Sequence, residues 1–149
     1  MFDVAKENGL TDRDQLRKLS VSEQQRLQKI AAEKIAGHEE EVVIIDTHAF
    51  ISSPEGYYPG LPEHVLKIIK PDNFVSVSAK PEEIYNRRMK DNTRSRDNIT
   101  LANIKKELDV QSGMISACAV ITGSPVRLVL NGEGKIDETA DKIIRAIGL

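Results

Sequence analysis

The sequence predicts an α/β protein built on a parallel sheet. Three short runs rich in β-branched residues, at 42–46, 74–78 and 126–131, have the length and composition of strands. Helical patterns lie between these runs and again after the last one. Such alternation is typical of a parallel sheet, because parallel neighbours have to be joined by a crossover connection that usually contains a helix.

The chain before the first run is predicted to be helical. Residues 2–10 and 11–19 each have the pattern of a short helix. A longer helix is expected to begin at Ser20, because Ser20 followed by Glu23 three residues later fits a capping box. Gly37 is a suitable residue to end it.

Residues 42–46, Val-Val-Ile-Ile-Asp, predict the first strand. Four consecutive β-branched residues are typical of a strand buried on both faces. Asp46 then stands at the carboxyl end of the strand, which is where ligands bind in open α/β sheets. Phosphate-transfer enzymes use a carboxylate in this place to hold Mg²⁺, directly or through water. The alternative is that Asp46 is only a solvated strand end.

The remaining elements follow in order. Residues 47–60 are rich in Pro, Gly and Ser and predict a loop. Pro62 suits the first position of a helix that Pro71 stops. After the second strand a helix is expected from Pro81 to about Lys90. The other expected segments are a polar linker at 91–98, a long helix from about Thr100 whose small residues at 112–120 face the sheet, the third strand, and a final helix at 136–147.

Length, charge and cysteine content limit the class of protein. A chain of 149 residues is enough for one domain with its own core. Its 21 basic and 23 acidic residues nearly cancel, so charge does not point to DNA, RNA or a membrane as the main partner. The one cysteine, Cys118, has no internal disulfide partner, and we see neither a leader nor an apolar run of about 18 residues. These features predict a soluble cytoplasmic protein.

Four arginines near the second strand form the strongest candidate site after Asp46. Arg87 and Arg88 lie near the end of the helix that follows this strand, and Arg94 and Arg96 lie in the linker beyond it. Guanidinium groups suit phosphate, because they stay charged and offer forked donors. The alternative is a set of solvated helix-end charges, and it applies most to Arg87.

Other side chains leave two interpretations open. Arg13 and Arg17 are four residues apart on one predicted helix face, where they can bind a second phosphate or pair with nearby acids, and spacing alone favours the ion pairs. His48 can line the site or be an ordinary loop histidine, which is the simpler interpretation. Tyr57 can pack on a base or anchor its loop, with equal weight for each. The three histidines show no metal-ligand spacing.

Four segments together closely resemble adenylate kinases of the archaeal type. They are DRDQLRKL at 12–19, IDTHAFI at 45–51, GYYPGLP at 56–62 and RSRD at 94–97. The resemblance runs over essentially the whole chain in the right order, and four motifs in series are far more specific than one. It implies a three-layer P-loop NTPase-like parallel sheet in one domain, 1–149, with AMP-side helices at about 1–37 and a short lid at about 91–98.

The resemblance also implies an activity and partners. Adenylate kinases of this type are cytoplasmic phosphotransferases that interconvert ATP plus AMP with two ADP, and they are often homotrimers. The strand-end carboxylate helps to position Mg²⁺, which here is Asp46, and an arginine of the early helix contacts the AMP phosphate, which best matches Arg17. The arginines of the lid region contact the nucleotide phosphates. The lid-region arginines matched in this way are Arg88, Arg94 and Arg96, which we expect to be catalytic, and the loop at 47–62 corresponds to part of the AMP side. The residues expected to bind nucleotide are Arg17, Arg13, Thr47, His48 and Tyr57.

One part of the family pattern is not found in these 149 residues. Such kinases have a strand and a Gly-x-x-Gly-x-Gly-Lys-Ser/Thr phosphate loop before the segments quoted above. Without them the expected sheet is incomplete, because its first strands and phosphate loop are absent. The resemblance therefore implies one of three proteins: a kinase whose recorded sequence starts late, a noncatalytic nucleotide-binding or interaction module derived from an adenylate kinase, or an inactive remnant.

Overall fold

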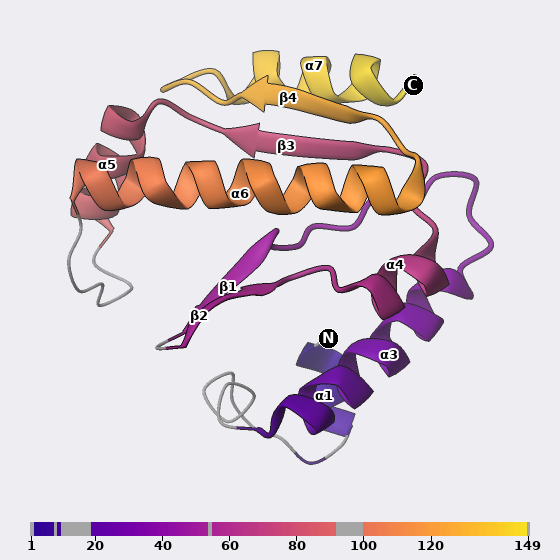
Figure 1. Cartoon of the computed structure of the whole chain (residues 1–149). Helices are drawn as coiled ribbons and strands as arrows, with labels where there is room; N and C mark the ends of the chain where they lie inside the picture. Colours follow the sequence, from indigo (N-terminus) through magenta and orange to yellow (C-terminus); the bar gives the residue numbers. More distant parts are fainter. Residues whose placement is uncertain (1, 8, 10–18, 54, 92–99, 149) are drawn as a thin grey trace. The chain divides into compact units, whose positions relative to one another are not determined.

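The computed structural model describes residues 2–7, 9, 19–53, 55–91 and 100–148 (Figure 1). These residues form two compact units. The helical unit is Met1–Thr47 with Leu61–Lys70, and the sheet unit is His48–Gly60 with Pro71–Leu149. The second predicted short helix and most of the predicted lid lie outside the described residues.

Three described helices form the helical unit. α1 and α3 pack together around the buried side chains of Val4, Leu27 and Ala31, and α4 packs against α3. The capping residue of α3 is Ser20, whose Oγ accepts a hydrogen bond of 3.3 Å from the backbone N–H of Glu23, as the sequence predicts. The helices span Phe2–Glu7 (α1), Val21–Ala36 (α3) and Glu63–Ile69 (α4).

The prediction of a strand at residues 42–46 is wrong. These residues have no regular secondary structure, and Val42, Val43 and Ile44 are 42%, 44% and 75% exposed. A strand is held by hydrogen bonds to a neighbour. The described strands pair only as β1 with β2 and β3 with β4, so residues 42–46 have no such neighbour. Asp46 therefore lies in an exposed irregular segment and not at the end of a strand.

The sheet unit confirms the predicted parallel α/β class. Strand β3 runs parallel to β4, with Phe74 opposite Val126 and Ser78 opposite Leu130. The bounds predicted for these two strands, for the helix after the second predicted strand and for the final helix agree closely with the structure. The elements span Phe74–Ser78 (β3), Pro81–Lys90 (α5), Leu101–Thr122 (α6), Val126–Leu130 (β4) and Ile136–Ile147 (α7).

Helices cover this small sheet. β3 and β4 lie between α6 and α7 in Figure 1, and α6 packs against both strands while α7 packs against β4. The side chain of Gln111 on α6 donates a 2.9 Å hydrogen bond to the hydroxyl of Ser76, which satisfies a polar group that is only 7% exposed. Although α6 has 22 residues, no described helix is both long and apolar enough to cross a membrane.

The region predicted as a loop at 47–60 contains an antiparallel pair of strands. β1 (Phe50–Ser53) pairs with β2 (Gly56–Pro59). Of the Pro and Gly residues that predicted a loop, Gly56 and Pro59 are the first and last residues of β2. Gly60 closes the pair by donating its N–H to the carbonyl of Ala49 at 2.9 Å. A Cβ at Gly60 would lie 1.8 Å from the carbonyl oxygen of His48, so only glycine fits here.

We expect Ile104→Ala to lower the free energy of unfolding by about 2–5 kcal/mol, because it leaves a cavity in the core. Ile104 lies on α6 and is only 1% exposed. The measurement is the urea midpoint of unfolding, and Lys105→Ala is the matched control, since Lys105 is an exposed neighbour on the same helix. Equal midpoints for the two variants would contradict this packing of α6.

Candidate functional site

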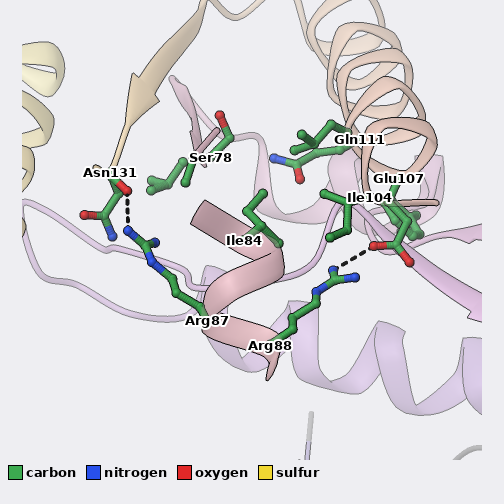
Figure 2. A pocket seen from close by; sticks show the side chains of 12 residues that line it. Ser78, Ile84, Arg87, Arg88, Ile104, Glu107, Gln111 and Asn131 are labelled. Atoms are coloured by element: carbon green, nitrogen blue, oxygen red, sulfur yellow. Dashed lines mark hydrogen bonds and ion pairs between the residues drawn. The ribbon is translucent and has the colours of Figure 1, made fainter. Parts of the chain in front are cut away.

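A pocket of about 290 Å³ lies in the sheet unit, where β3 and β4 end. Ser78, the last residue of β3, and Asn131, the first residue after β4, both line it. Side chains from α5 and α6 complete it (Figure 2). This is the edge at which parallel sheets bind their ligands. The polar side chains around the pocket are Ser78, Arg87, Arg88, Glu107, Gln111 and Asn131.

Arg87 joins α5 to the segment that follows β4. One terminal nitrogen of its guanidinium donates to the backbone carbonyl of Asn131 at 2.9 Å, as Figure 2 shows. Its Nε donates to the carboxylate of Glu133 at 3.1 Å. Both contacts are with the protein's own groups. They favour the structural interpretation of Arg87 over a role in binding phosphate.

Glu83 makes a second link between the same two segments. One carboxylate oxygen accepts from the backbone N–H of Glu133 and the other from the backbone N–H of Lys80, each at 3.1 Å. These bonds lower the pKa of Glu83, the one from Glu133 most, and the nearby charge of Arg87 adds to the effect. We call Glu83 and Arg87 the α5 clamp, because together they fix α5 beside the end of β4.

Arg88, another candidate site residue from the sequence analysis, also lines the pocket, but it is not part of the α5 clamp. It lies in the last turn of α5, and its Nη2 donates to Oε2 of Glu107 on α6 at 2.7 Å. The two side chains are 29% and 31% exposed. Among the described lining residues there are two guanidinium groups and one carboxylate, and Arg87 is paired with Glu133, which does not line the pocket. The candidate for binding an anionic group is therefore Arg88.

The other predicted site residues are not all described. Arg13, Arg17, Arg94 and Arg96 lie outside the described residues, so their roles stay predictions. Asp46 and Thr47 belong to the helical unit, and both are exposed, as is His48 in the sheet unit. Their proposed contacts with a nucleotide or a metal also stay predictions.

Tyr57 packs beside the pocket. Its ring meets that of Phe50 edge-on, with the ring centroids 5.1 Å apart, and Phe50 lines the pocket. The ammonium group of Lys106 lies 5.7 Å from the centroid of the Tyr57 ring. These contacts fit the interpretation in which Tyr57 anchors the β1–β2 segment.

The described residues contain no cluster of three or more His, Cys, Asp or Glu side chains able to hold a metal ion. In phosphate-transfer sites Mg²⁺ is held by one or two carboxylates together with substrate phosphates and water. The exposed carboxylate of Asp46 fits such a donor set. It does not fit a closed site built from protein ligands alone.

Glu107, Gln111 and Asn131 are site residues that the sequence analysis missed. Glu107 and Gln111 lie on the same face of α6 as the buried Ile104, at the spacing that places side chains on one side of a helix. Asn131 directly follows the carboxyl end of β4, and the sequence analysis had considered a strand-end ligand only at Asp46, after another predicted strand. A test for polar residues on otherwise apolar helix faces, and at every strand end, would have found all three.

We expect Glu83→Gln to make the stability of the protein less dependent on pH in the acid range. Because the folded-state pKa of Glu83 lies below its ordinary value of 4.5, its stabilising effect is present above that pH and is lost as the pH falls through the folded-state pKa. The gap in urea midpoint between the unsubstituted protein and Glu83→Gln should thus be widest near neutral pH and shrink in acid. Glu82→Gln, in the same helical turn, is the control, and a constant gap would refute the α5 clamp.

Comparison with known proteins assigns the chain to a family. The sequence model of a family described as "AAA domain" matches residues 1–105. An adenylate kinase of Thermoplasma acidophilum is 43% identical over 150 residues, which cover 100% of this chain and 81% of that protein. An adenylate kinase of Methanocaldococcus jannaschii is 41% identical over 149 residues, covering 99% and 78%. One of Thermoplasma volcanium is 43% identical over 148 residues, covering 99% and 81%. Identity at this level along the whole chain shows that the protein belongs to the adenylate kinase family.

Proposed function

We propose that the protein is a phosphotransferase that catalyses the reversible reaction of ATP and AMP to two ADP. The observation that carries this proposal is the 43% identity to an adenylate kinase over the full length of the chain. The pocket supports it, because a guanidinium group stands at the carboxyl edge of a parallel sheet, where phosphates bind in α/β proteins. The substrates proposed are therefore ATP, AMP and ADP.

The reaction needs no nucleophile from the protein. An oxygen of the AMP phosphate attacks the γ-phosphorus of ATP, and the bond to the β–γ bridging oxygen breaks, so that both products are ADP. Catalysis then depends on positioning and on dispersing the charge of the transferred group. We assign the role of dispersing this charge to Arg88, Arg94 and Arg96. We assign the binding of AMP to Arg17 with Arg13. Mg²⁺, held through water by Asp46, would neutralise phosphate charge when bound.

The organisation of the chain is part of the proposal. The two units would act as one adenylate-kinase-like domain, with the helices at about 1–37 on the AMP side and residues 91–98 as a short lid that excludes water. Thr47, His48 and Tyr57 would contribute to the nucleotide site. A cytoplasmic location and a homotrimer complete this proposal.

A second candidate is a noncatalytic nucleotide-binding or interaction module. The observation in its favour is that the 149 residues contain no Gly-x-x-Gly-x-Gly-Lys-Ser/Thr segment. That segment supplies the backbone N–H groups and the lysine that hold ATP phosphates in P-loop enzymes. A protein without it would retain AMP binding and lack phosphoryl transfer.

A coupled assay of ADP formation from ATP and AMP separates the two candidates. We expect turnover on the order of 1–100 s⁻¹ for a kinase. A protein that AMP stabilises against heat and ATP does not, and that forms no ADP, would instead be the binding module. The assay should include Mg²⁺, and its removal should abolish turnover.

We expect Arg88→Lys to lower kcat by about 10²-fold, because lysine keeps the charge and loses the forked donors that follow a moving phosphoryl group. The measurement is kcat and KM for both nucleotides. Arg145→Lys is the matched control, since Arg145 is an exposed arginine on α7, outside the pocket. An unchanged kcat in Arg88→Lys would remove Arg88 from the proposed mechanism.

A further inference from the structure

Glu107 is the one acidic side chain among the described residues that line the pocket. A carboxylate is an unexpected neighbour for a site that should attract phosphate, since like charges repel. Its contact is with Arg88, the arginine that we propose binds the transferred phosphate (Figure 2). The geometry of this pair therefore decides whether Glu107 helps or opposes binding.

The contact uses one edge of the guanidinium group. Oε2 of Glu107 accepts from Nη2 of Arg88, and the structure gives no second contact between the two side chains. A guanidinium has five N–H donors in a planar fork. A bidentate pair would take two parallel donors, whereas this single contact holds one terminal nitrogen of the group and leaves its other donors for another acceptor.

Both backbones that carry the pair are held in place. The α5 clamp, Glu83 and Arg87, fixes α5 beside the end of β4. On α6, Gln111 lies one turn after Glu107 and donates to Ser76 of β3 at 2.9 Å. The carboxylate thus stands on a helix that is itself tied to the sheet, and it can set the direction of a long side chain from the next helix.

Partial burial makes the contact stronger than an ordinary surface pair. The side chains of Arg88 and Glu107 are 29% and 31% exposed and 2.7 Å apart. The exposed pair of Lys29 and Glu33, on α3, is 62% and 55% exposed and 3.8 Å apart. Solvent and salt screen the second pair much more. An arginine has several rotatable bonds, so holding it before the ligand arrives removes an entropic cost from binding.

We propose that Glu107 is a positioning residue, which orients the guanidinium of Arg88 in the pocket so that its remaining donors meet the phosphate of a nucleotide. The inference rests on the proposed function for the identity of that phosphate. The orientation itself does not depend on catalysis, and it can be measured in the absence of nucleotide.

The first experiment is an NMR measurement on the full 149-residue protein of the Arg88 side-chain Nε–H signal, assigned by its loss in Arg88→Lys. We expect the signal to be sharp and resolved in the unsubstituted protein. In Glu107→Gln, which keeps the shape and removes the charge, it should shift or broaden. Asp109→Asn is the matched control, because Asp109 is an exposed carboxylate on the same helix that does not line the pocket, and here the signal should not change. An unchanged Arg88 signal in Glu107→Gln would overturn the proposal.

The second experiment titrates the same variants with ADP. We expect Glu107→Gln to bind ADP about ten-fold more weakly, the size expected for one charge-assisted hydrogen bond, and Asp109→Asn to bind it normally. Equal or tighter binding by Glu107→Gln would overturn the proposal, and tighter binding would mean that Glu107 competes with phosphate. If Glu107→Gln does not fold, Glu107→Asp takes its place, because it keeps the charge but shortens the reach, and the same shifts are expected to be smaller.

These readouts separate the inference from the proposed function. An unsubstituted protein that forms no ADP would refute the proposed activity, whereas the Arg88 signal would still show whether Glu107 orients the guanidinium. An unsubstituted protein that binds no ADP would refute the nucleotide site, and the same signal would again decide the positioning role.

Discussion

The parallel pairing of β3 with β4 is the interaction on which the described site depends. It brings the carboxyl ends of two strands, at Ser78 and Leu130, to one edge of the sheet. It also requires a crossover, which here contains α5 and α6 and delivers their side chains to that edge. The pocket, with residues from both strand ends and both crossover helices, is a consequence of this pairing.

Two neighbouring arginines on α5 have different surroundings because their side chains leave the helix in different directions. Arg87 meets Asn131 and Glu133 after β4, and Arg88 meets Glu107 on α6 (Figure 2). The first therefore stabilises the position of α5. The second stays beside a carboxylate that occupies one edge of its guanidinium, which is the arrangement expected of a group that is oriented before it binds an anion.

The segment at 42–46 shows the limit of reading a strand from composition. Its β-branched residues have high strand propensity, but propensity mostly reports how well a side chain packs in a sheet. In the described structure the segment has no paired neighbour and Ile44 is 75% exposed. The mistaken strand also removes the strand-end argument for Asp46, whose metal role now rests on family resemblance alone.

The sequence by itself determined the α/β class, the bounds of β3, α5, β4 and α7, the family, and the presence of Arg88 near a strand end. The elements follow from short-range patterns: residue periodicity, capping residues and the order of elements along the chain. The family follows from the resemblance of four sequence segments. Only the tertiary structure decided that residues 42–46 lack a strand partner, that Arg87 clamps α5, and that Glu107 meets Arg88. Each of these depends on contacts between residues distant in sequence, such as Arg88 and Glu107, which are 19 positions apart, and local patterns do not encode such contacts.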